Sequence, residues 1–349
     1  MSSILRRIRG EIPAEFFAAL MVAVLFVAVI VADQMHWWEL KPEYMFGWLV
    51  PFFVGYVVMD RWPKIMAGLR PTGESPLPAG VQMVLSLVFG GALLSGGAFF
   101  LLGALNRAGF GVTQPGSLAL AMGFAGLLLG VVYFNAPVGR IAIGETRPGW
   151  GAWRADARLH VVSQFVFPAL IWVISAPLVD AVENQLSLFL LRKVVAVVSF
   201  TFNLLGFPLI REGSTLVLPN DQRVGVEDAC SGIRSLTACL FTGTFLAAVF
   251  LERWWKKIAL IASALALAVF TNLLRSVFLT AWAYANGSDA IGGSFHDATG
   301  YAVLGLTFVG LLCLLPLFEG RNWLRWLGPK GAAAVKRGGD GAPPGAVGR

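Results

Sequence analysis

Among the three cysteines of the chain, Cys230 has the surroundings expected of a nucleophile. It follows the acidic residues Glu227 and Asp228 and precedes Ser231 and Gly232, after which a long apolar run begins. The thiol is therefore expected at the N-terminus of a membrane helix, where the helix dipole favours the thiolate. Because a free cysteine is often just a small buried apolar residue, Cys230 needs chemical partners before it can be interpreted as catalytic.

Two polar side chains farther along the chain are candidate partners. Arg275 lies inside a later apolar run, with Asn272 three residues before it on the same helix face. An arginine within a span is costly and is usually paired or functional, although one near a span end can also extend its charge to the interface. His296, followed by Asp297, opens the last apolar run. Taken alone, an interfacial histidine is more often a hydrogen-bonded surface group than a base.

Together these groups meet the needs of acyl transfer. The thiol is the nucleophile, the guanidinium stabilises the oxyanion with backbone N–H groups near Ser231 and Gly232, and the imidazole moves the proton. Whether His296 acts as acid or base stays open, because a helix N-terminus disfavours imidazolium whereas Asp297 favours it. Arg234, one turn past the cysteine, is either a substrate-facing or a structural group.

The remaining reactive side chains are interpreted as structural. Cys239 falls on the opposite helix face from Cys230, and both Cys239 and Cys313 lie within apolar runs, which favours packing. His36 and His160 sit at the ends of runs without reactive neighbours. The cysteine spacings and the supply of histidine predict no disulfide framework, no metal site and no cofactor.

The elements that must position these groups are membrane helices. The chain of 349 residues is 57% hydrophobic and only 13% charged, which differs from a soluble globular protein. Long apolar runs predict an all-α polytopic membrane protein. About eight spans are expected, at about 16–32, 44–60, 81–104, 117–135, 160–179, 231–251, 257–284 and 297–318. The first run is long and lacks a small-residue cleavage site, which favours an uncleaved span over a signal peptide.

The distribution of basic residues predicts that both termini are cytoplasmic. With the N-terminus inside, most of the 27 lysines and arginines fall in cytoplasmic segments, and the outer segments hold only Lys41, Arg107, Arg192, Lys193, Arg211 and Arg223. The candidate catalytic groups then all lie near the outer face. The predicted organisation is a four-span region at 1–159, a catalytic membrane core at 160–320, and a basic cytoplasmic tail at 321–349 whose composition predicts disorder.

One long outer segment, about 180–229, connects the fifth and sixth runs. Its apolar first half is interrupted by polar residues such as Glu183 and Arg192, which predicts a helix along the interface or among the spans that does not cross. Its second half alternates around Asn220 and Asp221, which predicts a small outer β-hairpin that leads to Cys230.

Glycine-rich patches within the spans indicate close helix packing. They include the pair Gly90 and Gly91 and the spaced pair Gly126 and Gly130. No strand precedes these glycines, so they do not form a nucleotide-binding fingerprint. No nucleic-acid partner is expected.

At three motifs the sequence resembles the exosortase/archaeosortase family of polytopic membrane cysteine transpeptidases. The matching stretches are Ala-Cys-Ser-Gly-Ile-Arg-Ser at 229–235, Asn272-x-x-Arg275, and His296-x-x-x-Gly300. Their order, spacing and position on the spans agree with that family's cysteine, arginine and histidine. The resemblance covers roughly 160–318, whereas the first four spans match only as hydrophobic helices.

The resemblance implies cleavage of exported proteins that carry a C-terminal tripartite sorting signal. In bacterial members this signal is a short Pro-Glu-Pro-like motif, a transmembrane helix and a basic cytoplasmic end (PEP-CTERM), and the genes often accompany exopolysaccharide synthesis. The implied location is the bacterial inner membrane, with the active site on the extracytoplasmic side and a thioester as the acyl-enzyme. The recognition motif, the scissile bond, the acceptor and the oligomeric state are open at this point.

Two other classes compete with this interpretation. A membrane protease of another type is disfavoured, because the chain has no His-Glu-x-x-His and no Gly-x-Ser-x-Gly run. A non-catalytic transporter or exopolysaccharide-export component could use Arg234 and Arg275 to bind an anionic sugar or lipid. Against it, the chain has no internal repeat and no pair of broken spans.

Overall fold

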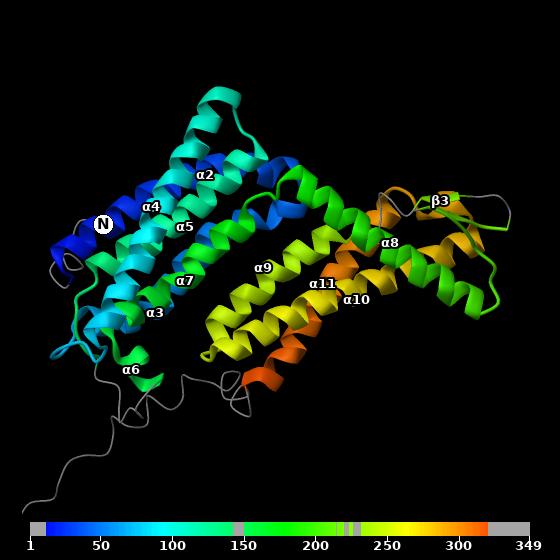
Figure 1. Cartoon of the computed structure of the whole chain (residues 1–349). Helices are drawn as coiled ribbons and strands as arrows, with labels where there is room; N and C mark the ends of the chain where they lie inside the picture. Colours follow the sequence, from blue (N-terminus) through cyan, green and yellow to red (C-terminus); the bar gives the residue numbers. More distant parts are fainter. Residues whose placement is uncertain (1–11, 142–149, 214, 220–222, 226–231, 320–349) are drawn as a thin grey trace, which may run out of the picture.

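The computed structural model describes residues 12–141, 150–213, 215–219, 223–225 and 232–319, and this part of the chain is mainly long helices (Figure 1). The helices are α2 (Ala14–Leu40), η1 (Pro42–Leu49), α3 (Val50–Leu69), α4 (Ala79–Phe110), α5 (Gln114–Asn135), α6 (Trp150–Ala155), α7 (Ala157–Ser175), α8 (Asp180–Leu204), α9 (Ile233–Phe250), α10 (Trp254–Asn286), η2 (Ser288–Ile291) and α11 (Ser294–Glu319). The predicted all-α membrane class is confirmed. The predicted tail at 321–349 lies outside the described residues.

Nine helical stretches in the described part of the chain are long and apolar enough to cross a membrane, and each predicted span falls on one of them. The additional one is α8, which is a continuous helix of 25 residues. The expected polar interruptions do not break it, because Glu183 and Asp180 lie in its first turn, where acidic side chains favour the positive end of the helix dipole.

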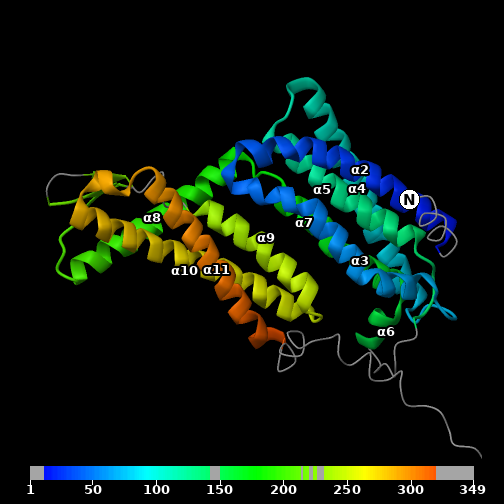
Figure 2. The same ribbon diagram turned by 180° about the vertical axis from the view of Figure 1, so that it is seen from behind.

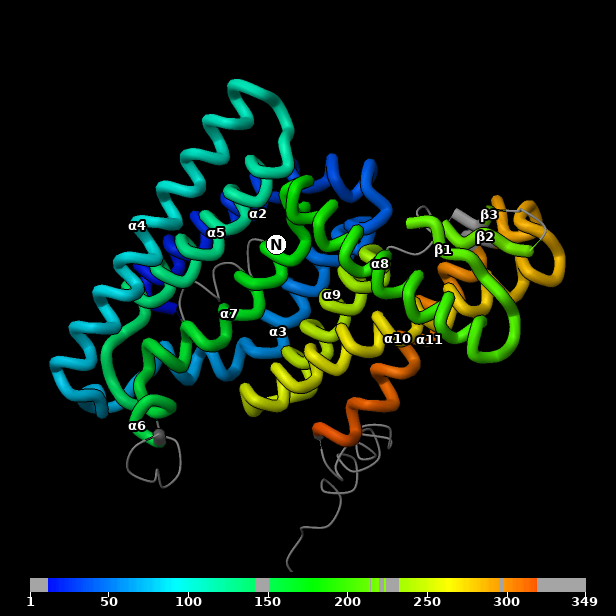
Figure 3. The backbone as a smooth tube through the Cα atoms, turned by 45° about the vertical axis from the view of Figure 1, so that its right-hand side comes forward, coloured from blue at the N-terminus to red at the C-terminus, as the bar shows by residue number. Residues whose placement is uncertain are grey.

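The first bundle consists of α2, η1–α3, α5 and α7 around a core of large side chains, with α4 on its outside (Figure 3). Trp38, Tyr44, Tyr133 and Trp172 are among its fully buried residues. Burying rings of this size stabilises the bundle through apolar area, and the ring N–H and O–H groups need partners. Trp38 donates to the Ser175 carbonyl at 3.4 Å, so the ring both packs and joins α2 to the end of α7.

Helices α4 and α5 touch backbone to backbone through glycine. A Cβ added to Gly123 would lie 2.4 Å from the Phe100 nitrogen, and one added to Gly126 would lie 2.6 Å from the Ala92 carbonyl oxygen. The packing role predicted for Gly126 and Gly130 is therefore confirmed. It does not hold for Gly91, which has nothing within 4 Å, because this residue is on the other side of α4.

The C-terminal helices α9, α10 and α11 pack on one another and join the first bundle through α9 (Figure 2). Within α9 the side chains mostly alternate between buried and partly buried, and only Arg234 is exposed. Two glycine positions on this surface have no room for a side chain, since a Cβ on Gly243 would lie 2.7 Å from Ala264 Cβ, and one on Gly310 would lie 2.8 Å from a Leu267 methyl. The first contact presses α9, the helix that follows Cys230, against α10, and the second presses α11 against α10.

The contacts of α9 define two ends of the molecule. At one end, Arg61 of α3 is buried and donates to the carbonyl of Ala248 at 2.7 Å, which caps the C-terminus of α9 with a cation. His160 lies near the same end, with its Nε2 3.1 Å from the Lys64 carbonyl oxygen. We call this the basic end. At the opposite end, Thr237 in the second turn of α9 donates to the carbonyl of Glu43 in η1 at 2.8 Å.

Helix α8 begins and ends away from the basic end. Its first turn contacts Lys41 at the opposite end, and its later residues pack on the last third of α10, where Val195, Phe202, Leu279 and Ala283 share an apolar cluster. Both α8 and the segment after it therefore stay at the opposite end, where α9 also starts. That the segment does not cross the membrane stays a prediction, since α8 is one of the nine stretches long and apolar enough to span.

Beyond α8 lies a three-stranded antiparallel sheet of β1 (Ile210–Glu212), β2 (Thr215–Val217) and β3 (Arg223–Gly225) in that order. The β2–β3 pair, in which Leu216 opposes Val224, is the predicted hairpin. The expected turn at Asn220 and Asp221 lies outside the described residues. The strand β1 was not predicted, because its three residues are all exposed and carry no alternating pattern. Leu216 is fully buried in the cluster with α8, which fixes the sheet to the helices.

Candidate active site

The start of α9 is pressed against α10. Gly232 caps α9 with a left-handed backbone, φ 67° and ψ 1°, a conformation that glycine adopts without steric cost. A Cβ at this position would lie 2.7 Å from Asn272 Nδ2 and 3.0 Å from its Cγ. Asn272 itself is buried on α10. Gly232, two residues after Cys230, is therefore fixed both by its dihedral angles and by its contact with Asn272, the predicted supporting residue.

The start of α11 is pressed against the same helix one turn farther on. The Arg275 Nε lies 3.5 Å from Thr299 Oγ1, and a Cβ added to Gly300 would lie 3.5 Å from Arg275 Nη2. Gly300 leaves the guanidinium room to lie along α11. His296 is four residues before Gly300 in the same helix, so its backbone lies about one turn away on the same side.

Helix α10 thus brings together the two chain segments that carry the other predicted catalytic groups. Cys230 and Ser231 lie outside the described residues, directly before Gly232. His296 and Asp297 belong to the first turn of α11 by their backbone, and their side chains lie outside the described part. The convergence therefore rests on described contacts between Gly232 and Asn272, and between Arg275, Thr299 and Gly300.

Arg234 has a different position from the other candidates. It lies in the first turn of α9 and is exposed, whereas Ile233 and Ser235 on either side of it are buried. Among the described residues it makes no ion pair. Both alternatives for Arg234, a substrate-facing and a structural role, stay predictions.

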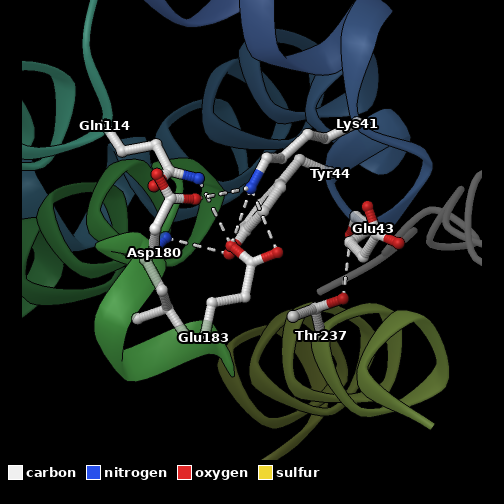
Figure 4. A network of polar contacts seen from close by, with 8 residues as sticks. Lys41, Glu43, Tyr44, Gln114, Asp180, Glu183 and Thr237 are labelled. Atoms are coloured by element: carbon white, nitrogen blue, oxygen red, sulfur yellow. Dashed lines mark hydrogen bonds and ion pairs between the residues drawn. The ribbon is translucent and has the colours of Figure 1, made fainter. Parts of the chain in front are cut away.

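A polar network that was not predicted anchors the same end of the protein (Figure 4). Lys41, after α2, makes an ion pair with Glu183 of α8 at 3.0 Å, and both side chains are largely buried. Tyr44 accepts a hydrogen bond from the Leu178 backbone N–H at 2.9 Å. Together with Thr237 on Glu43, these contacts tie η1 to α8 and to the start of α9. Sequence offered one signal for the network, the isolated Lys41 in an outer segment poor in cations.

In the described part of the chain, no group of three or more His, Cys, Asp or Glu side chains is placed to hold an ion.

The geometry predicts a large effect for Gly232→Ala. Its methyl group would meet Asn272 and its backbone would be strained, so the turn must shift, and a shift of about 1 Å at a catalytic group costs roughly a hundredfold in rate. We expect this loss for whatever reaction Cys230 carries out. Gly206→Ala is the matched control, since Gly206 also has a positive φ of 84° but nothing within 4 Å of an added Cβ. Equal activity of the two variants would contradict the role of the contact.

Comparison with known proteins identifies the kind of chain to which this site belongs. The family model of the transmembrane exosortases matches residues 37–313, which is most of the chain and includes the starts of α9 and α11 together with Arg275. No curated protein and no solved structure matches the chain.

Proposed function

Because the chain belongs to the transmembrane exosortase family, we propose that it is an integral membrane cysteine transpeptidase that cleaves C-terminal sorting signals of exported proteins. The observation that carries this proposal is the placement of Arg275 and Asn272 on α10. These two residues contact the start of the helix that follows Cys230 and the start of the helix that holds His296. These contacts support the proposal that one nucleophile, one cation and one imidazole meet at one end of the molecule.

In the proposed reaction the Cys230 thiolate attacks the carbonyl carbon at the outer end of the substrate's transmembrane helix. The carbonyl oxygen becomes an oxyanion, which Arg275 and the backbone N–H groups near Gly232 stabilise by charge and hydrogen bonding. An arginine suits this role, because it stays charged at all working pH values and presents several N–H donors in a fixed plane.

The intermediate then collapses with cleavage of the carbon–nitrogen bond. His296 is proposed to give a proton to the leaving amine, which departs with the transmembrane helix, and the acyl part stays on Cys230 as a thioester. An amine or another acceptor, or water, then attacks the thioester and releases the thiolate. Asp297 and Asn272 are proposed to support the imidazole and the guanidinium respectively.

We place the site on the extracytoplasmic side of a bacterial cell membrane, with both termini in the cytoplasm. The support is the distribution of charge. Arg61, Lys64 and Lys257 lie at the end of the molecule away from Gly232, and the positive-inside rule assigns such an end to the cytoplasm. Exported substrates would then reach the site from the side to which they have been translocated.

The test is thiol-dependent cleavage in proteoliposomes. The enzyme would carry Cys239→Ala and Cys313→Ser, which leave Cys230 as its single thiol. The substrate is a reporter that ends in the tripartite signal, and the control reporter lacks the apolar helix. We expect cleavage of the first reporter alone, and its loss after treatment with a membrane-impermeant maleimide that reaches the end of the protein near Gly232. Cleavage that is indifferent to the maleimide would contradict the proposal.

A further inference from the structure

Three aromatic rings lie beside the candidate active site, and one of them, Phe295, packs against the apolar cluster shared by α8 and α10. Phe278 and Trp282 are on α10, and Phe295 opens α11. The ring centroids of Trp282 and Phe295 are 5.3 Å apart with planes 25° from parallel, and those of Phe278 and Phe295 are 6.2 Å apart at 29°. Phe278 and Trp282 are 6.1 Å apart at 33°. Phe295 thus stacks with both Phe278 and Trp282, and we call the three rings the aromatic ledge.

The residues of the aromatic ledge are close neighbours in sequence of the residues that the proposed reaction uses. Phe278 lies three residues, less than one helical turn, after Arg275, and Phe295 immediately precedes His296. Thr299, which contacts Arg275, is four residues after Phe295 and therefore on the same face of α11. The ledge joins the segment that holds the arginine to the segment that holds the histidine.

Two of the three rings are exposed, whereas Phe295 is partly buried. Phe278 is 48% exposed and Trp282 is 40% exposed. Among the described residues the Trp282 indole N–H has no hydrogen-bond partner. The ledge therefore offers an apolar surface and one hydrogen-bond donor at the same place.

The direction of α10 decides which part of a substrate would reach the ledge. This helix starts at the basic end and passes Asn272, which is level with the start of α9, before it reaches Arg275, Phe278 and Trp282. Its 33 residues span about 50 Å at about 1.5 Å per residue, more than the roughly 30 Å hydrocarbon layer. The ledge is therefore on the far side of Arg275 from the bilayer centre.

We propose that Phe278, Trp282 and Phe295 form a specificity subsite that binds an apolar side chain of the extended peptide segment just upstream of the scissile carbonyl. This inference rests on the proposed function. The substrate's helix must lie in the bilayer with its end at Arg275, so the residues before that carbonyl continue outward over the rings. Flat aromatic faces bind apolar side chains of non-helical peptides, and the Trp282 N–H is placed to donate to a peptide carbonyl.

The alternative is that these rings are ordinary aromatic residues of a membrane–water interface, which would affect protein stability but not the choice of substrate. The two roles differ in what they do to substrate preference. A subsite changes the KM for one side chain relative to another, whereas an interfacial anchor changes the amount of folded protein for all substrates alike.

The test measures steady-state cleavage of two reporters that differ only in the upstream segment, one with apolar residues and one with serine and asparagine. For wild type we expect preference for the apolar reporter. Trp282→Ala should raise the KM for that reporter about fivefold to tenfold, which is the size expected for a lost aromatic contact, with kcat nearly unchanged and little effect on the polar reporter. Phe278→Leu, which keeps an apolar side chain but removes a ring, should move the preference in the same direction.

The matched control is Trp255→Ala, because Trp255 is also an exposed tryptophan, 60% accessible, but lies near the basic end in the first turn of α10. The Trp255→Ala variant should prefer the apolar reporter to the same extent as wild type. If Trp282→Ala does not fold, Phe278→Leu and Trp282→Phe decide the matter. Equal KM changes for both reporters, or no change in any variant, would overturn the subsite. Absence of Cys230-dependent cleavage in wild type would instead overturn the proposed function.

Discussion

Replacing Cys230 by alanine should abolish cleavage of the sorting signal while the protein still folds and inserts. Without the sulfur no acyl-enzyme can form, and loss of a nucleophile in enzymes of this kind costs at least about four orders of magnitude in rate. The measurement is single-turnover cleavage of the signal-bearing reporter in membranes, with folding checked by the thermal transition of the purified protein. Cys230→Ser should be nearly as inactive, because a hydroxyl is far less ionised than a thiol at neutral pH.

Two other cysteines serve as controls for this result. Cys239 is 3% exposed in the apolar cluster that joins α9 to α10 and α11, so Cys239→Ala should lower stability without removing activity. Cys313 is exposed on α11, and Cys313→Ser should change neither property by much. Full cleavage by Cys230→Ala would remove the residue from the mechanism and would favour a non-catalytic role for the chain.

The second large effect is expected for Arg275→Lys. The substitution keeps the positive charge but loses the planar set of donors, whose Nε contacts Thr299 and whose Nη2 lies beside Gly300. If Arg275 stabilises the oxyanion, kcat should fall by about 10²- to 10³-fold with little change in KM, because that interaction is made only in the transition state. Arg275→Ala should be at least as severe.

The matched control for this prediction is Arg192→Lys on α8, since Arg192 is exposed and distant from Gly232 along the chain. Its kcat should stay within about twofold of wild type. A rise in KM without a fall in kcat for Arg275→Lys would contradict the oxyanion role and would point to ground-state binding of substrate instead.

The helices could be predicted from sequence because their signal is long and local. Each predicted span coincides with a described helix, since about twenty consecutive apolar residues have few alternatives in a membrane protein. The prediction that α8 does not cross the membrane rests on charge, because a crossing would place the basic loops on the wrong side. It stays a prediction, since α8 is also long and apolar enough to span. The sequence did not predict that α8 is continuous over Asp180–Leu204. Its polar residues are accommodated on one unbroken helix and do not interrupt it.

The candidate site was partly predictable for a different reason. Arg275 could be identified because a charged side chain within an apolar run is energetically costly. Gly232 could be identified from its place after Cys230. The tight contact between Gly232 and Asn272 and the aromatic ledge could not be identified, because each joins residues far apart in the chain. The division at residue 160 between the first region and the catalytic core stays a prediction.

The most direct measurement is chemical capture of the acyl-enzyme. The enzyme is mixed with the signal-bearing reporter, quenched in acid within the first turnover, and digested for mass spectrometry, with a parallel sample treated with hydroxylamine. We predict the upstream reporter fragment on the Cys230 peptide and not on the peptides of Cys239 and Cys313, and its release by hydroxylamine as a hydroxamate. Cleavage of the reporter by wild-type protein with no acyl group on Cys230 and no hydroxamate would contradict this prediction.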